Sequence, residues 1–179
     1  SSLAKKNGYV INLDRAEKLE KMTYSSLFSK AGIIVLEDTD ESLLGKVDKL
    51  EVCDNNLYVL EKGRGLFLFN KQGKFIKMIG RQGKGPGEYI DPDDISIDRE
   101  NKKIYVLDSQ TQNVLKYSGN GTFESSFKLE NKGTRSTFIQ PFKNALYTNL
   151  YTFDKSGKRF LLSKVDVTNG KRISFQFVE

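Results

Sequence analysis

The chain has 179 residues, of which 37% are hydrophobic and 29% are charged, and its formal net charge is +6. This is the composition of an ordinary globular domain, and no apolar run approaches the ~18 residues that a membrane-spanning helix needs. Histidine is absent, which excludes Ser-His-Asp and Cys-His nucleophilic machinery and histidine metal sites, and the single cysteine, Cys53, cannot form an internal disulfide.

The N-terminal part contains one strong strand signal. Residues 1–8 are polar, and residues 9–13 alternate like a short strand. Residues 14–21 are rich in helix formers, and residues 25–30 are compatible with several structures. The run of β-branched residues at 33–37, which follows Gly32, predicts a strand, and an acidic loop comes after it.

From residue 43 onward a unit of four short strands recurs. The first copy has predicted strands at 50–53, 57–60, 66–69 and 73–79, and the second has them at 94–98, 104–107, 113–117 and 121–127. Ile104 lies 47 residues after Leu57, and Gly121 lies 48 residues after Gly73. A period of about 40–50 residues built from four strands is typical of a β-propeller blade.

A weaker third copy follows, with predicted strands at 136–142, 145–151, 159–166 and 171–178. The sequence therefore predicts an all-β propeller of four-stranded antiparallel blades, with about three to four blades in the chain. The expected division is 1–42 as a partial blade and 43–88, 89–132 and 133–179 as blades of one incomplete domain. So few blades should not close a ring. The chain is therefore expected to be a fragment of a longer protein, to associate with other chains to complete the ring, or to fold differently from a blade over residues 1–42, and the fragment is favoured.

Aromatic residues recur at equivalent positions of the two clear copies. Tyr58 corresponds to Tyr105, and two further pairs are Phe75 with Phe123 and Phe69 with Tyr117. Large rings fill the wedge between neighbouring twisted sheets, where each buried ring contributes ~2–3 kcal/mol. We expect these residues to pack between blades.

The glycine-rich lead-in to the second copy carries a family resemblance. Residues 79–89 read IGRQGKGPGEY and are followed by the DISID strand at 94–98 and the IYVLDS strand at 104–109. These motifs resemble NHL-type repeats, and in particular the six-bladed propellers of Bacteroides-like bacteria that are exported or are lipoproteins. The resemblance implies a partial six-bladed propeller, a periplasmic or surface location in the cell envelope, and a lipid anchor upstream. It implies no activity.

Two clusters are candidate sites. Residues 80–87 contain four glycines, but no Ser or Thr follows Lys84 as a P-loop requires, so we expect a connection between blades that can form the rim of a ligand face. The acidic residues Asp91, Asp93 and Asp94 are weak candidates for a metal site, because their spacing does not match an EF-hand. The expected ligand-binding residues are Arg64, Arg81, Lys84, Glu88, Tyr89 and Asp91. No cofactor and no catalytic set is expected.

Three functions remain open. The first is an exported module whose loops on one propeller face bind a glycan, a peptide or a protein. The second is a lyase or hydrolase that uses acidic and tyrosine residues of the same face. The third is RNA binding by basic residues beside Tyr58 or Tyr105, which the spread of lysines along the chain disfavours. The sequence favours the first function, a binding module, over an enzyme.

Overall fold

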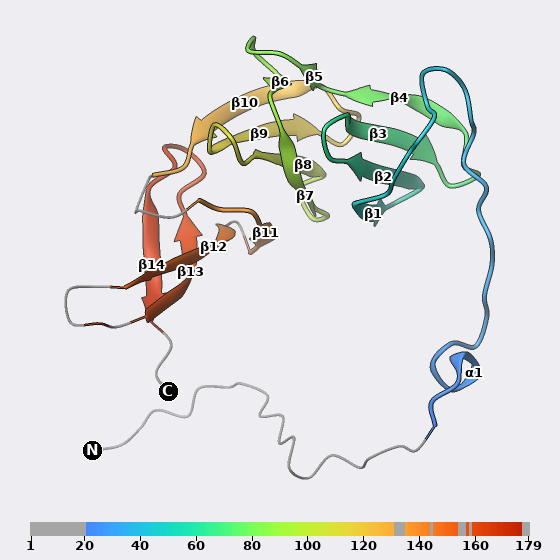
Figure 1. Cartoon of the computed structure of the whole chain (residues 1–179), viewed down its shortest axis with the longest axis horizontal. Coiled ribbons are helices and arrows are strands. Elements are labelled where there is room, and N and C mark those ends of the chain that lie inside the picture. The colour runs from blue at the N-terminus through green and yellow to red at the C-terminus, as the bar shows by residue number, and fades with distance from the viewer. Residues whose placement is uncertain (1–20, 131–134, 144, 154–156, 158, 177–179) are drawn as a thin grey trace. The chain divides into compact units, whose positions relative to one another are not determined.

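The computed structural model describes residues 21–130, 135–143, 145–153, 157 and 159–176 (Figure 1). The chain divides into two compact units, Ser1–Ile33 and Ile34–Glu179. In the first unit the described part contains one short helix, α1 (Tyr24–Leu27), which overlaps the segment 25–30 that is compatible with several structures by sequence. The strand expected at 9–13 lies outside the described residues. The finer division at 42, 88 and 132 stays a prediction.

The second unit is built from four-stranded antiparallel sheets, as the sequence predicts. The first sheet contains β1 (Lys49–Cys53), β2 (Asn56–Glu61), β3 (Gly65–Asn70) and β4 (Phe75–Ile79). The second contains β7 (Pro92–Asp98), β8 (Lys103–Asp108), β9 (Asn113–Ser118) and β10 (Phe123–Lys128). The third contains β11 (Ile139–Phe142), β12 (Ala145–Phe153), β13 (Arg159–Val165) and β14 (Arg172–Gln176). In every sheet the strands are paired in sequence order.

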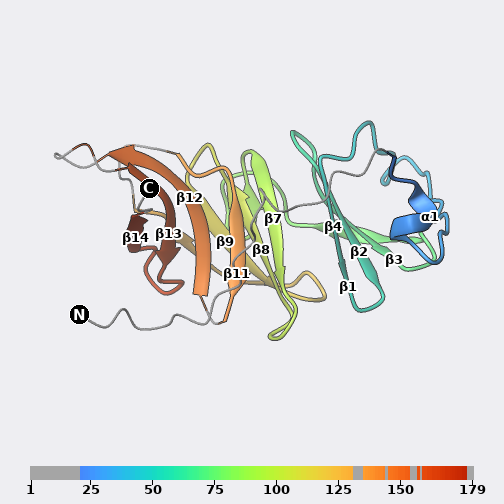
Figure 2. The ribbon, with the colours of Figure 1, turned by 90° about the horizontal axis from the view of Figure 1, so that it is seen from below.

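The three sheets follow one another face to face, and Figure 2 shows them side by side. Their first strands are neighbours, since β7 contacts both β1 and β11. The described residues do not form a closed ring.

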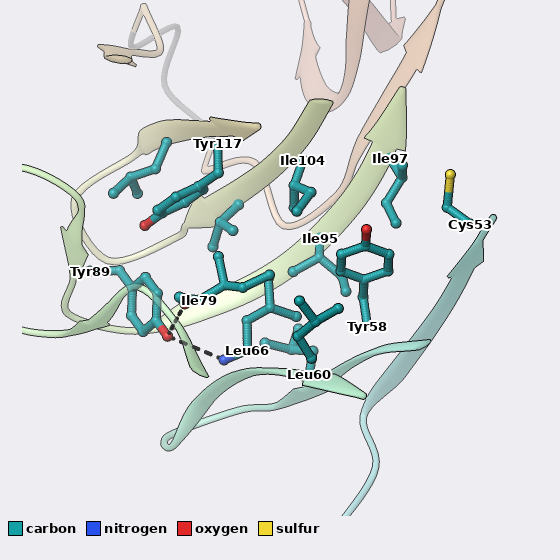
Figure 3. Packing of buried hydrophobic residues seen from close by; sticks show 13 residues of the cluster. Cys53, Tyr58, Leu60, Leu66, Ile79, Tyr89, Ile95, Ile97, Ile104 and Tyr117 are labelled. Carbon is teal, nitrogen blue, oxygen red and sulfur yellow. Dashed lines mark hydrogen bonds between the residues drawn. The ribbon is translucent and has the colours of Figure 1, made fainter. Parts of the chain in front are cut away.

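Hydrophobic clusters fill the two seams between the sheets. The first seam joins sheets one and two through Tyr58, Leu60, Leu66, Ile95, Ile104 and Tyr117, among others (Figure 3). The second seam joins sheets two and three through Tyr105, Leu107, Val114, Phe127, Ile139, Leu146 and Val165. Tyr58, Tyr105 and Tyr117 are buried in these seams, which confirms the expected packing between sheets for these three rings. Phe69 and Phe75 instead belong to a third cluster, formed by the first sheet with Leu36 and Leu44.

The aromatic pairs also recur in space. The rings of Phe69 and Phe75 meet edge to face with centroids 5.5 Å apart, and those of Tyr117 and Phe123 meet in the same way at 5.8 Å. Equivalent sequence positions of the first two sheets therefore hold equivalent contacts. Edge-to-face pairs of this kind add about 0.5–1.5 kcal/mol to area burial.

The strand predicted at 33–37 is not formed, so this prediction is wrong. Within the described part of the chain no strand pairs with these residues, and Ile33 and Val35 remain 93% and 79% exposed. The segment is instead anchored at its end, where the Glu37 N–H donates to the carbonyl of Gly73 (2.8 Å) and the Glu37 carboxylate accepts from the N–H of Phe75 (2.8 Å).

The same anchor occurs at the exit of β10. The Glu130 N–H donates to the carbonyl of Gly170 (3.0 Å), and the Glu130 carboxylate accepts from the N–H of Arg172 (3.0 Å). In both places a Leu-Glu pair thus attaches to the turn glycine before the fourth strand of a sheet. Because residues 123–128 form a fourth strand directly before their anchor, the residues before Leu36 occupy the corresponding position in the repeat.

Candidate functional site

The connection between β4 and β7 forms a compact loop. Within it β5 (Arg81–Gln82) and β6 (Glu88–Tyr89) pair in parallel, Arg81 opposite Glu88 and Gln82 opposite Tyr89. The N–H of Gly83 donates to the carbonyl of Tyr89 (3.0 Å), and the N–H of Glu88 donates to that of Gly85 (3.0 Å). The glycines allow these tight turns, because Gly80 and Gly87 have φ of 68° and 73°.

Tyr89 holds this loop to the first sheet. Its hydroxyl donates to the carbonyl of Ile79 (3.0 Å) and accepts from the N–H of Leu66 (3.2 Å), and the side chain is fully buried (Figure 3). Tyr117 acts similarly from β9 by donating to the carbonyl of Gly87 (3.0 Å). Burial raises the pKa of both phenols. Tyr89, one of the predicted ligand-binding residues, thus stabilises the loop from within and does not line the cleft described below.

The carboxylate of Glu88 occupies the position in the glycine-rich loop where a bound anion would accept hydrogen bonds. Its carboxylate accepts from the N–H of Gly85 (2.8 Å) and from Nε of Arg81 (2.6 Å). The hydrogen bond from Gly85 is the largest cause that lowers the pKa of Glu88, and the bond from Arg81 comes second. The backbone N–H groups that a phosphate could use in a P-loop are directed here at the chain's own carboxylate.

This arrangement predicts a titration experiment. Because the pKa of Glu88 is lowered in the folded state, its bonds contribute stability above the unfolded pKa, and this is lost as the pH falls through the folded pKa. Arg81→Gln should raise the pKa of Glu88 but leave it below its ordinary value, since Gly85 still donates. Carboxyl-carbon NMR titration measures this. A Glu88 pKa that Arg81→Gln does not move would contradict the assignment, and Lys71→Gln is the control.

The loop borders an open cleft of about 700 Å³ beside the second sheet. Its lining residues come from the loop, from the β8–β9 turn and from β9 and β10: Gly83, Lys84, Gly85, Pro86, Glu88, Ile90, Asp108, Thr111, Asn113, Phe123, Ser125, Ser126 and Lys128. We call this the crossover cleft. Volumes of this size suit small-molecule ligands.

Both carboxylates of the crossover cleft are engaged within the fold. Asp108 is buried and accepts from the N–H groups of Ile90 (2.8 Å) and Thr111 (3.1 Å). Glu88 is held by Gly85 and Arg81 as described above. In contrast, Lys84 and Lys128 are exposed, and within the described part of the chain neither has an ion pair.

Of the predicted ligand-binding residues, Lys84 and Glu88 line this cleft, whereas Arg64 and Asp91 do not. Arg64 donates to the carbonyl of Leu43 and to the Glu61 carboxylate (3.1 Å), and it lies over the ring of Phe67. Arg81 lies at the edge of the loop and does not line the cleft, but its guanidinium pairs with the Glu88 carboxylate, which does.

Two acidic residues at the start of β7 form ion pairs with lysines. Asp93 pairs with Lys62 at 2.6 Å, and Asp94 pairs with Lys49 at 2.7 Å. Asp94 also accepts from the N–H of Ile139 (2.8 Å), so this buried carboxylate links the first strands of all three sheets. Among the described residues no group of three or more acidic or cysteine side chains is placed to hold a metal ion.

Sequence reasoning missed the half of the cleft that β9 and β10 contribute. Thr111, Asn113, Ser125, Ser126 and Lys128 belong to the second copy, yet no local motif marks them. One signal was available: the β10 sequence FESSFK has two serines on an outer strand where the first copy has Lys77 and Met78.

The sequence was compared with models of protein families. A family described as a domain of unknown function, DUF4934, matches residues 8–177. The chain belongs to the DUF4934 family. The comparison with curated proteins found no match. No helix in the described part of this DUF4934 chain is long and apolar enough to cross a membrane.

Two solved structures are similar to the DUF4934 chain. One is from Bacteroides fragilis and is named as a candidate exported protein, with a TM-score of 0.64 and 26% identity over 75% of this chain and 38% of that one. The other is a member of the DUF4221 family from Bacteroides vulgatus, with a TM-score of 0.54 and 10% identity over 82% of this chain and 49% of that one. The DUF4934 chain therefore spans less than half the length of each.

Proposed function

We propose that this DUF4934 chain is part of an exported β-propeller module that holds a ligand in the crossover cleft. The observation that carries the proposal is the cleft itself, which is built by a loop that Tyr89, Tyr117 and Glu88 fix from three directions. A rigid loop that borders an open cavity is suited to binding, because little conformational entropy is lost when a ligand is held. The ligand class is a glycan, a peptide or a protein.

The propeller is supported by the recurrence of the sheets. Three four-stranded sheets follow one another with neighbouring first strands. The shared Leu-Glu anchor supports the proposal that the residues just before Leu36 correspond in the repeat to the fourth strand of a preceding sheet. Both similar solved structures are longer than the region they share with this chain. An NHL-like ring of six blades is the finer form of this proposal.

Apolar residues on the outward face of the third sheet also support the proposal that the propeller contains further sheets. Tyr147 occupies the position of Tyr58 and Tyr105, and it lies beside Phe142 with ring centroids 6.4 Å apart. Together with Phe138, Gln140 and Leu162 it lines an open apolar hollow of about 410 Å³. We propose that another sheet covers this face, either in a longer polypeptide or in an associated copy.

Export is supported by the name of the Bacteroides fragilis protein, which describes that protein as a candidate for export. We propose a cell-envelope location for this chain on that similarity, with a lipid anchor upstream as a further element of the proposal.

The two other functions have less support. Tyr58 and Tyr105 are buried in the seams and present no stacking platform for RNA bases. The cleft carboxylates Glu88 and Asp108 are bound to backbone N–H groups, which disfavours a role as general acid or base. Binding without catalysis is therefore the function we propose.

Filling the crossover cleft tests this proposal. Ser126→Trp places an indole on the exposed surface of β10 that lines the cleft, whereas Thr122→Trp places one in the β9–β10 turn outside it. We expect a ligand found by screening glycans and peptides to lose at least about tenfold in affinity with Ser126→Trp, because the cavity is occupied, and to bind Thr122→Trp normally. Equal binding by the two variants would place the ligand elsewhere.

A further inference from the structure

We infer that the crossover cleft selects an acidic oligosaccharide, that is, a short sugar chain that carries carboxylate or sulfate groups. This inference rests on the proposed binding function and names its ligand class. It follows from the charges that face the cavity, from the hydroxyl groups along its wall and from its size.

The charge available to a ligand in the cleft is positive. The lining contains two carboxylates and two ammonium groups, but their surroundings differ. Asp108 is buried with two N–H donors on its oxygens, and Glu88 is bound by the guanidinium of Arg81 and by the loop backbone. Lys84 and Lys128 keep their ammonium groups exposed and have no carboxylate partner in the described residues. An anionic group placed between them would gain charge-assisted hydrogen bonds.

The wall offers hydrogen-bonding groups suited to sugar hydroxyls. Thr111, Ser125 and Ser126 are exposed, and in the described structure their hydroxyls form no bond with other protein groups. Asn113 adds an amide that can both donate and accept. Phe123 supplies apolar surface, and its ring is fixed by the edge-to-face contact with Tyr117. Short polar side chains beside one aromatic ring can recognise a chain of hydroxylated rings.

A peptide strand fits the same wall less well. The outer edge of β10 could in principle pair with an added strand. A register shift between Phe123 and Ser125 interrupts this edge, and such irregularities oppose regular strand addition. Recognition in the cleft therefore depends on its side chains and not on backbone pairing along β10. This favours a saccharide over a peptide strand as the ligand.

Calorimetric titration of the 179-residue chain tests the inference. The probes are a trimer of galacturonic acid, a sulfated chondroitin tetrasaccharide, the neutral trimer maltotriose and a hexa-aspartate peptide. We expect at least one acidic saccharide to bind about tenfold more tightly than maltotriose, and its affinity to fall with salt. Lys84→Gln and Lys128→Gln should each weaken it about threefold, and the double variant about tenfold. Lys71→Gln, in the β3–β4 turn, should change nothing.

The outcomes distinguish the specificity for acidic saccharides from ligand binding in the crossover cleft. Tight binding of either acidic saccharide that depends on both lysines supports the inference, and the stronger of the two identifies carboxylate or sulfate. Maltotriose binding of equal strength, blocked by Ser126→Trp but unaffected by the lysine variants, would overturn the acidic ligand and leave the proposed function intact. Stronger binding of hexa-aspartate would overturn the saccharide. If Ser126→Trp affects no ligand at all, the proposed function fails as well.

Discussion

Replacement of Asp94 by Ala is expected to lower the free energy of unfolding by about 3 kcal/mol. Asp94 is 6% exposed, and its carboxylate binds Nζ of Lys49 on β1 and the buried N–H of Ile139 on β11. Its removal leaves the N–H of Ile139 without an acceptor and Lys49 without its closest partner, and broken buried pairs cost about 3–5 kcal/mol. Urea denaturation of the variant measures the loss.

The neighbouring residue provides the matched control. Asp93 pairs with Lys62, whose side chain is 46% exposed, and exposed pairs of this kind contribute about 0–1 kcal/mol. Asp93→Ala should therefore be nearly neutral. If the two variants are equally stable, Asp94 does not link the three sheets as described.

Replacement of Gly80 by Ala is expected to cost about 3 kcal/mol or more. A Cβ at this position would lie 2.6 Å from Oη of Tyr117 and 2.6 Å from Cε1 of Tyr89, two buried rings that cannot move freely. Overpacking of a core costs about 1–3 kcal/mol, and the left-handed backbone of residue 80 adds about 1–2 kcal/mol for a residue with a side chain. Thermal unfolding of the variant measures the sum.

Gly63 separates these two contributions. Its φ of 81° is also left-handed, but a Cβ there would meet no atom within 4 Å. Gly63→Ala should therefore show the backbone cost alone, about 1 kcal/mol. A Gly80→Ala variant no less stable than Gly63→Ala would mean that the glycine-rich loop does not pack on Tyr89 and Tyr117 as described.

The sheets could be predicted from the sequence because each strand carries its own signal. Continuous runs of four apolar residues at 57–60 and 104–107, with turns at fixed offsets, indicate strands without knowledge of their neighbours. The prediction failed at 33–37, where the residues favour a strand but no partner strand lies beside them in the described structure. Strand formation depends on pairing as well as on local preference.

The candidate site was predicted less completely because its residues act over long separations in the sequence. The Asp108 carboxylate binds the N–H of Ile90 across 18 residues, and the Tyr89 hydroxyl binds the N–H of Leu66 across 23. The sequence indicated that the loop at 80–87 is special, and it identified Lys84 and Glu88. It could not indicate that Glu88 binds the loop itself, that Tyr89 points inward, or that the serines of β10 face the same cavity.

The most direct test of the proposed binding site is NMR chemical-shift mapping of the ¹⁵N-labelled chain during titration with an acidic oligosaccharide. The account predicts that the perturbed amides gather around the crossover cleft, at Gly83, Lys84, Gly85, Asn113, Ser125 and Ser126. Saturable shifts confined to the seams, around Tyr58 and Gly119 or around Tyr105 and Pro141, would contradict it.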